Sequence, residues 1–493
     1  IDLPTSPQPC AKLAYKTPRA SETPEPPHPM QPMNHPLPRR DFLAHSALAG
    51  ILPLLPHSTH AAASTLRIAP FRFDVTPPLG HPLCGGWIKP ATSVDDTLEA
   101  IGYVITGADQ PIVVCAVDWT GILNEAHLAW REALASAANT SPERVAVHCV
   151  HQHDAPFVCL HAERLIAAEK AGLSVVQMEF FSDCLKRGTA AVRKAINETV
   201  PLTHVATADT RIHEVASNRR IAVDKDGKVR KGRTSSCRDP ELIALPEGLI
   251  DPMMKSVALY SGDRKVVVSH YYATHPMSHY GAGRVSSDFP GLARKQRQTD
   301  DPNCTHIYFT GCSGDVTAGK YNDGSPDARI RLTRRILDGM LDAEKRFRAE
   351  PITQLAWRTH SVLPECNPLF LAETLRTKVS DPANVAANRI RPAMVLGWQK
   401  RLAEKVPIVL SALRIGDISL LHLPAESFVA YQLKAQSIVQ NRFVATAAYG
   451  DGGPWYIPLK TDYPKGGYEV GVANCADSIE STLTAGIADL LRS

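Results

Sequence analysis

Residues 124–156, "NEAHLAWREALASAANTSPERVAVHCVHQHDAP", decide the fold of this chain. Apolar residues recur at helical spacing up to residue 139, and the run from 145 to 150 is apolar except for His148, as in a buried strand. The preceding segment "IGYVITGADQPIVVCAV" (101–117) has a Gly-Ala-Asp turn between two apolar runs, which predicts a β-hairpin. A hairpin followed by a helix and a buried strand is typical of α/β domains.

The remainder of the chain continues this alternation of strands and amphipathic helices. We therefore predict an α/β fold with a large mixed β-sheet flanked by helices, in a single domain of catalytic size over residues 64–493. Residues 360–405 are expected to be mixed helix and loop. Strands are predicted at 203–212, 254–260, 265–273, 304–310, 407–422 and 443–449, and helices around 163–197 and 326–349.

Composition places the chain among ordinary globular proteins. Its 493 residues are 44% hydrophobic and 21% charged, which is enough to form a sizeable core and excludes a disordered or fibrous protein. The net charge of +4 is small, and the basic stretch "DKDGKVRKGR" (224–233) contains Asp-Gly, so we interpret it as a solvated hairpin and expect no nucleic-acid binding. The cysteines after Cys10 form no C-x-x-C motif, so the core must stabilise the fold.

The first 63 residues differ from the rest in composition. Residues 1–38 are rich in proline and without pattern, and we expect them to be disordered or non-native. Residues 39–63 have paired arginines, an interrupted apolar stretch and three alanines, which predicts a twin-arginine signal peptide cleaved after Ala63. A mature protein in the periplasm or outside the cell is therefore expected, with at most peripheral membrane contact.

The stretch "VHQHDAP" (150–156) places two histidines directly after the apolar run. In an extended chain, side chains two positions apart point to the same face, so His151 and His153 would lean into one site. This spacing suits a metal ligand beside a proton-transfer group. Taken alone, the pair carries little information and is more often two solvated histidines at the end of a strand.

Other polar residues also follow apolar strands, where α/β proteins carry their chemistry. Each has a structural alternative, such as a satisfied core histidine, a carboxylate at a helix start, or a packed tyrosine. They are His275 and His279 in "VVVSHYYATHPMSH" (266–279), Ser313, Asp315 and Thr317 in "THIYFTGCSGDVTAGKYNDG" (305–324), Glu426 in "IGDISLLHLPAESF" (415–428), and Tyr456, Tyr463 and Tyr468 in "AAYGDGGPWYIPLKTDYPKGGYE" (447–469).

Together these motifs resemble a known family. "FDVTPPLG", "VHQHDAP", "SNRR", "THPMS…SSDFPG", "GCSGDVTAG", "LPAESF" and "YIPLKTDYPKGGYE", in this order, resemble the catalytic domain of the neutral/alkaline ceramidases over roughly residues 68–490. Those enzymes are zinc-dependent amidases that split ceramide into sphingosine and a fatty acid. The resemblance is most specific in the tyrosine loop, whose three tyrosines match the family's spacing.

The resemblance implies a set of site residues. The Zn²⁺ ligands would be His151, His275, Glu426 and Tyr456. His153 would transfer protons, and Arg219 and Tyr468 would donate hydrogen bonds to the substrate carbonyl and the oxyanion. Thr317 stands where the family has a serine, and its extra methyl group stiffens the side chain, which leaves its catalytic role open.

The resemblance implies an exported zinc-dependent hydrolase that cleaves the amide bond of ceramide or a related N-acyl lipid. The chain ends in the helical sequence "SIESTLTAGIADLLRS", so we expect it to lack the family's C-terminal immunoglobulin-like domain. That absence and Thr317 leave open a hydrolase of a soluble amide, such as an N-acylated sugar or peptide. A further alternative is a non-catalytic protein that binds lipid or glycan, which loss of the ligands would favour, but all four implied metal positions hold competent donors.

Overall fold

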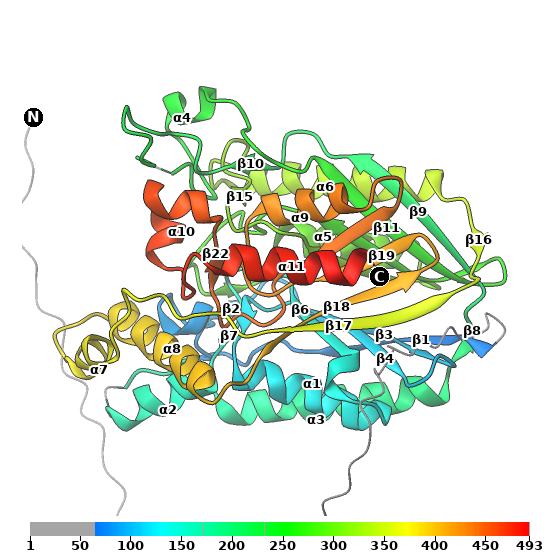
Figure 1. Ribbon diagram of the computed structural model, residues 1–493, viewed down its shortest axis with the longest axis horizontal. Helices are drawn as coiled ribbons and strands as arrows, with labels where there is room; N and C mark the ends of the chain where they lie inside the picture. Colours follow the sequence, from blue (N-terminus) through cyan, green and yellow to red (C-terminus); the bar gives the residue numbers. More distant parts are fainter. Residues whose placement is uncertain (1–64, 171, 231, 493) are drawn as a thin grey trace, which may run out of the picture. The chain divides into compact units, whose positions relative to one another are not determined.

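The computed structural model describes residues 65–170, 172–230 and 232–492 (Figure 1). The predicted extension (1–38) and twin-arginine signal (39–63) lie outside these residues, so both stay predictions. The α/β class is confirmed. The described strands, however, form three larger mixed sheets of five, five and four strands rather than one large sheet.

The first sheet contains the hairpin and the strand–helix–strand unit predicted around residues 101–150. Strands β3 and β4 pair antiparallel, and β4 runs parallel to β6 with α1 between them in the chain. Helix α3 packs on β1 and β3 because its buried residues recur every three or four positions. The strands, in sheet order, are β6 (Val145–Cys149), β4 (Ile112–Val117), β3 (Glu99–Thr106), β1 (Arg67–Asp74) and β8 (Val200–Pro201), and the helices are α1 (Glu125–Ala138), α2 (Leu160–Ala168) and α3 (Met178–Asn197).

The second sheet is covered by two helices, α5 (Asp288–Asp300) and α6 (Pro326–Arg346). Its strands β12 and β14 are parallel, while the other pairs are antiparallel. The strands predicted at 203–212, 254–260, 265–273 and 304–310 are confirmed. In sheet order they are β14 (Thr305–Thr310), β12 (Arg264–Tyr272), β11 (Met253–Ser261) and β9 (His204–Arg211), followed by β16 (Glu350–Pro351).

The third sheet corrects one prediction. The run 407–422 forms two antiparallel strands, because the chain turns at Gly416, whose φ of 55° favours glycine. Strands β19 and β21 are parallel. The sheet order is β17 (Leu355–Val362), β18 (Ile408–Ile415), β19 (Ile418–His422) and β21 (Phe443–Ala447), and the covering helices are α9 (Val429–Ile438) and α11 (Ile479–Arg492).

Shorter elements complete the described chain. The helix predicted over 163–197 is interrupted between α2 and α3, where Gly172 has a φ of 69°. Segment 360–405 contains α7 (Ala372–Ser380) and α8 (Ala386–Ala403), as the expectation of mixed helix and loop allows. The hairpin predicted at 224–233 forms around a bridge between Val223 and Val229.

The remaining elements are short strands and helical turns. They are β2 (Ser93–Val94), β5 (Gly121–Ile122), β7 (Phe157–Val158), β10 (Ser217–Asn218), β13 (Arg284–Val285), β15 (Val316–Thr317), β20 (Glu426–Ser427), β22 (Tyr456–Ile457), α4 (Pro240–Ala244), α10 (Tyr468–Gly471) and the 3₁₀ turns Cys84–Gly86, Pro142–Arg144 and Lys460–Lys465. No helix in the described part of the chain is both long and apolar enough to cross a membrane.

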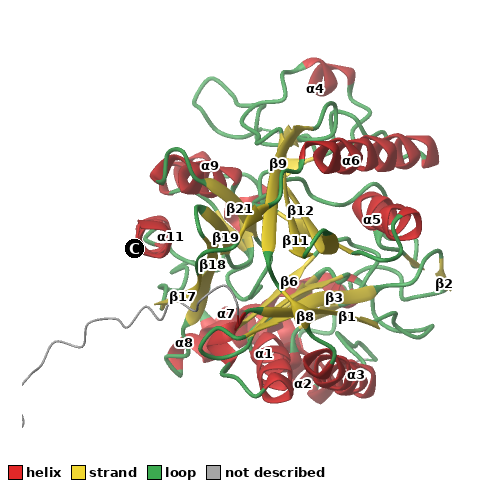
Figure 2. Cartoon of the chain, turned by 90° about the vertical axis from the view of Figure 1, so that its right-hand side faces the viewer, coloured by secondary structure: helices red, strands yellow, loops and turns green. Residues whose placement is uncertain are grey.

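The three sheets lie inside, with their helices on the outer faces (Figure 2). Hydrogen bonds connect the sheets at the carboxyl ends of their parallel strands. The Cys149 amide donates to the Tyr449 carbonyl (2.8 Å), and the Ala448 amide donates to the Thr310 carbonyl (2.9 Å). Since loops leaving these ends meet at one place, the fold brings together side chains from all three sheets.

A buried ion pair fixes the loop after β21. The Asp451 carboxylate contacts Arg401 and accepts hydrogen bonds from the amides of Asn124 (3.2 Å) and Gly453 (3.0 Å). Burial opposes ionisation, but Arg401 and His127 hold the pKa of Asp451 far below its ordinary value. This pair therefore stabilises the folded state at pH values above the ordinary aspartate pKa, about 4, and the contribution is lost as the pH falls.

Replacing Asp451 with asparagine should destabilise the protein strongly. The substitution leaves the Arg401 guanidinium buried without a counter-charge, which costs about 3–5 kcal/mol. Urea unfolding at pH 7 measures the loss. Asp338→Asn, at an exposed helix pair with Arg334, is the matched control and should change the free energy of unfolding by less than about 1 kcal/mol. Equal effects of the two variants would contradict the proposed importance of the Asp451 pair.

Candidate active site

A cavity of about 800 Å³ opens where the three sheets meet. One part of its wall is aromatic and apolar, with Trp87, Phe157, Met277, Tyr280 and Trp455. The other part is polar and comes from the segment 229–242. Seven of the eight predicted site residues line the cavity: His151, His153, Arg219, His275, Glu426, Tyr456 and Tyr468.

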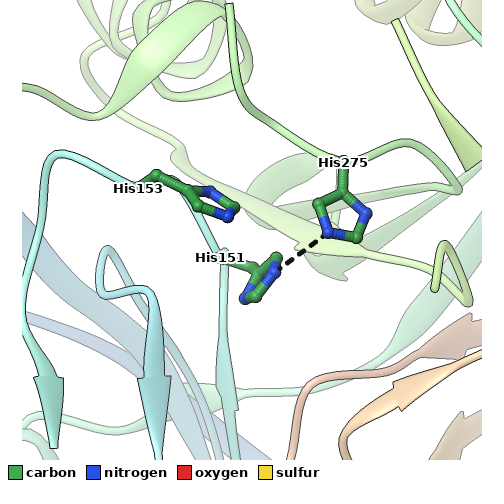
Figure 3. Close-up of side chains that lie close together, drawn as sticks. All are labelled: His151, His153 and His275. Atoms are coloured by element: carbon green, nitrogen blue, oxygen red, sulfur yellow. Dashed lines mark hydrogen bonds between the residues drawn. The ribbon is translucent and has the colours of Figure 1, made fainter. Parts of the chain in front are cut away.

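Three predicted metal ligands come together in this cavity, each from a different sheet. His151 follows β6, His275 follows β12, and Glu426 follows β19. The two histidine Nε2 atoms are 3.2 Å apart, and the Glu426 Oε2 atom lies 3.3 Å from His151 Nε2 and 3.1 Å from His275 Nε2. Figure 3 shows the His151 and His275 rings with His153 beside them.

Backbone carbonyls fix the orientation of both histidine rings. His151 Nδ1 donates to the Thr120 carbonyl (2.6 Å), and His275 Nδ1 donates to the Ser313 carbonyl (2.7 Å). Burial lowers the pKa of His275 to about 4, so its Nε2 carries a free lone pair at neutral pH. Such a second contact on Nδ1 is typical of histidines that bind metal ions through Nε2.

The triangle of donor atoms fits a metal ion. Edges of 3.1–3.3 Å match the spacing between ligands of one tetrahedral ion with bonds of about 2.0–2.1 Å. The buried Glu426 Oε2 atom makes no hydrogen bond. A buried carboxylate facing two imidazole lone pairs is an arrangement that a cation stabilises.

The two histidines of "VHQHDAP" do share a site, but the chain between them is not extended. His151 has a φ of 78°, so the backbone turns there, and the rings of His151 and His153 lie 4.8 Å apart at an angle of 74°. The expectation of an extended chain was therefore wrong, and the shared site arises from the turn. Strand β6 ends at Cys149, so the alternation of side chains along a β-strand cannot be applied to the residues after it.

His153 differs from the other two histidines in its contacts. Its Nδ1 atom is buried without a hydrogen-bond partner, so no carbonyl fixes its tautomer. A ligand atom of His153 still lies within 4.8 Å of those of His151 and His275. Burial, together with the two neighbouring histidines, lowers the pKa of His153 well below its ordinary value. A neutral imidazole that can change tautomer can accept a proton at one nitrogen and return it to a nearby group.

Arg219 and Tyr456 form the part of the wall beside this cluster. Tyr456 is paired with Glu426 in the short β20–β22 ladder, and its ring stacks on that of His275 at 6.4 Å. The Arg219 guanidinium lies 5.1 Å from the Tyr456 ring centre and is 2.7 Å from Glu469. Burial raises the pKa of the Tyr456 phenol well above its ordinary value, so the neutral phenol is favoured unless a cation binds nearby.

Tyr468 is the most exposed of the predicted site residues. Its side chain is 62% exposed, and its ring lies 5.7 Å from that of Tyr456. Tyr463, the third residue of the tyrosine spacing, instead donates a hydrogen bond to the Cys475 carbonyl (2.8 Å). Two of the three tyrosines thus belong to the cavity wall, and the third holds the loop in place.

The structure does not bring Thr317 to the cavity. Its hydroxyl donates to the Thr234 carbonyl (3.3 Å) and accepts from the Gly319 amide (3.2 Å), and its strand β15 pairs with the backbone at His275. Thr317 therefore positions the chain beside a cavity histidine. Ser313 and Asp315 are buried too, and Asp315 accepts from the Asn218 side chain (2.8 Å) and the Val429 amide (2.8 Å).

Removing the Thr317 hydroxyl should therefore affect stability more than chemistry. Thr317→Val leaves the buried Gly319 amide without its acceptor and should cost about 1–3 kcal/mol in urea unfolding. Thr317→Ser keeps both bonds and should change turnover by less than about two-fold, which is well below the loss expected for a catalytic group. A large change in turnover for the serine variant would instead support direct contact with the substrate.

Two residues next to the site had no clear signal in the sequence. The Tyr449 ring stacks on His151 at 4.2 Å, and its hydroxyl bonds to Ser313 Oγ (2.8 Å). Glu469 pairs with both Arg219 and Arg220. Tyr449 follows β21 as the other site residues follow their strands, so its position after an apolar strand was the one available signal.

A second group of histidines lies in the second sheet, away from the cavity. His270 and His306 stack at 6.1 Å, and Glu344 lies beside them. The Glu344 carboxylate is already paired with Arg297 (2.9 Å) and Lys265. These cations would repel a metal ion, so we interpret this group as a buried ion-pair network.

Comparison with solved structures identifies the fold. A ceramidase solved in complex with C2 superimposes with a TM-score of 0.66 over 87% of this chain and 75% of its own, at 15% sequence identity. The neutral ceramidase from Pseudomonas aeruginosa superimposes with a TM-score of 0.63 over 87% of this chain and 74% of its own, at 16% identity. No protein-family profile and no curated protein matches the sequence. The chain thus has an α/β fold similar to that of the neutral ceramidases, as its motifs indicated.

Proposed function

We propose that this protein is a zinc-dependent hydrolase that cleaves the amide bond of ceramide or a related N-acyl lipid. The observation that carries the proposal is the triangle of His151 Nε2, His275 Nε2 and Glu426 Oε2 in the cavity of a fold similar to that of neutral ceramidases. Imidazole nitrogen and carboxylate oxygen are ordinary zinc donors. In this proposal Tyr456 is a further ligand, and the ion would keep a position for water or substrate.

The roles of the other residues follow from their positions. A zinc ion would supply Lewis acidity toward the amide carbonyl and toward water. His153 would accept the proton of the attacking water and return it to the leaving amine, because it lies beside the cluster and its tautomer is not fixed. Arg219 and Tyr468 would donate hydrogen bonds to the oxygen that becomes negative in the transition state.

The two kinds of cavity wall suit an amphiphilic substrate. Trp87, Phe157 and Trp455 offer an apolar surface for an acyl chain, whereas Arg230, Ser235 and Arg238 offer charge and hydrogen bonds for a polar group. The polar side also supports the second candidate, which is a hydrolase of a soluble N-acyl amide. A binding protein without activity is less well supported, since every proposed ligand position holds a competent donor.

Metal content and hydrolysis test the proposal on the chain 64–493. About one zinc ion per chain is expected, together with release of fatty acid from a short-chain ceramide in detergent. Comparing an N-acylated sugar and an N-acylated amino acid separates the lipid from the soluble candidate. A folded protein that holds no metal after zinc has been supplied would contradict the mechanism and favour the binding protein.

Export is proposed on the twin-arginine motif alone. Changing Arg39 and Arg40 to lysine should retain the protein in the cytoplasm of the expressing cell, since the export machinery reads the arginine pair. Cell fractionation with immunodetection measures the distribution. An unchanged distribution would mean that residues 39–63 are not this kind of signal.

A further inference from the structure

Two cysteines face each other across a short antiparallel contact between the segments after β17 and after α10. Cys366 and Cys475 form an isolated β-bridge. The Asn367 amide donates to the Asn474 carbonyl (2.8 Å), and the Ala476 amide donates to the Glu365 carbonyl (3.0 Å). These hydrogen bonds join the residues on either side of the cysteines and not the cysteines themselves. Cys366 and Cys475 therefore form what is called a non-hydrogen-bonded antiparallel pair, in which opposed side chains come closest.

This position has the geometry that a disulfide needs. Opposed residues in such a pair have Cα atoms about 4.5 Å apart, within the range of about 4.4–6.8 Å found for disulfides. Cys115 and Cys149 provide a contrast, since they are offset by two positions on the parallel strands β4 and β6. That offset separates their Cα atoms by about 8 Å, which is too far for a bond without backbone movement.

The surroundings of the pair agree with this placement. Cys475 is fully buried. Burial raises the pKa of its thiol well above the ordinary value, and the nearby Cys366 thiol adds a smaller effect in the same direction. Cys366 is half-buried, and the Gln399 side-chain amide donates to its sulfur (3.8 Å). Cys366 is therefore the thiol that an external reagent can reach first, and Cys475 is placed to complete the exchange.

We propose that Cys366 and Cys475 are joined in a disulfide when the protein is exposed to a disulfide oxidant. The Cys366 thiolate would attack the oxidant, such as oxidised glutathione, and release one reduced thiol. The Cys475 thiolate would then displace the second thiol and form the Cys366–Cys475 bond. In balance, the protein loses two protons and two electrons, and the oxidant disulfide is reduced to two thiols.

The bond would stabilise the loop that forms part of the cavity wall. The Asn474 amide donates to the Pro454 carbonyl (3.0 Å), its side chain donates to the Gly453 carbonyl (2.8 Å), and the Tyr463 hydroxyl donates to the Cys475 carbonyl. These contacts hold the loop that carries Trp455 and Tyr456. The partner strand belongs to the segment that leaves β17 toward α7, drawn in yellow in Figure 1. The disulfide would thus tie two segments that are distant in the sequence and would restrict the unfolded chain.

Peptide mapping of the chain 64–493 after treatment with oxidised glutathione tests the proposal. We expect a cross-linked peptide that contains Cys366 and Cys475 and disappears on reduction, and two fewer titratable thiols than in the reduced protein. Reduction should lower the melting temperature by about 3–5 °C, because the bond closes a loop of more than 100 residues in a large domain.

Variants and a control complete the test. Cys366→Ser should lose the cross-link and the melting shift on reduction, whereas Cys115→Ala, which breaks the offset pair, should keep both. If either variant fails to fold, the peptide map of the wild-type protein still decides the question. Full thiol content in the oxidised protein, or a cross-link between other cysteines, would overturn the proposal. None of these outcomes depends on zinc or on amide hydrolysis.

Discussion

Glu426→Gln should produce a folded protein that has lost both its metal and its activity. Glutamine has the shape of glutamate, and its amide can donate a hydrogen bond to a free Nε2 of His151 or His275, so the empty site is no longer unfavourable. The carboxylate charge that attracts the cation is gone. We expect turnover to fall by more than about 100-fold. Mutation of residues that only hydrogen-bond to metal ligands already lowers metal affinity or activity by about 10–100-fold.

Zinc analysis and turnover of the same preparation check this result. Glu404→Gln, at an exposed i,i+4 pair with Lys400, removes one carboxylate elsewhere and should retain wild-type zinc and turnover. Urea unfolding of both variants without metal separates loss of the ligand from loss of the fold. If Glu426→Gln kept stoichiometric zinc, Glu426 would not be a ligand.

His153→Ala should separate metal binding from catalysis. The side chain lies beside the cluster without a fixed tautomer, so its removal leaves the three closely spaced donors in place. We expect zinc content to be unchanged and kcat to fall by about 10²–10⁴, the usual contribution of a general acid–base group. Elemental analysis and steady-state kinetics on one preparation measure both quantities.

The matched control is His161→Ala, since His161 is a half-buried histidine in α2 that does not line the cavity. Its kcat should stay within about two-fold of the wild type, far from the loss expected for a general acid–base group. Loss of zinc in His153→Ala would make His153 a ligand instead. The assignment of proton transfer would then have to move to another cavity residue.

The sequence allowed prediction of the α/β class and of the individual strands, because long apolar runs such as 265–273 are unambiguous. Apart from the hairpin at 101–117, it did not allow the pairing of strands to be predicted, since periodicity identifies a strand and not its neighbour. For this reason we expected one large sheet where three form. Gly172 and Gly416 were visible turn signals, and both mark places where a predicted element is divided.

The site was predictable where side chains directly follow strands, as at His275. Arg219 and Tyr456 were assigned to the same site by the order of the motifs that resemble the family. Spacing and composition alone could not have assigned them. The left-handed backbone of His151 was not predictable, because its neighbours Val150 and Gln152 carry no signal for a positive φ. The direction of the Thr317 hydroxyl was not predictable either, since it depends on the segment around Thr234, which is distant in the sequence.

The three proposed metal-binding side chains follow strands of three different sheets, and this affects when during folding a metal ion can bind. His151 and His275 are 124 residues apart and follow strands of two sheets, and Glu426 follows β19 of the third, so the complete donor set exists only after all three sheets have docked. A metal ion could therefore not guide the early steps of folding. An ion bound so late would slow unfolding and leave the refolding rate unchanged, and its main effect would be to lengthen the lifetime of the finished protein.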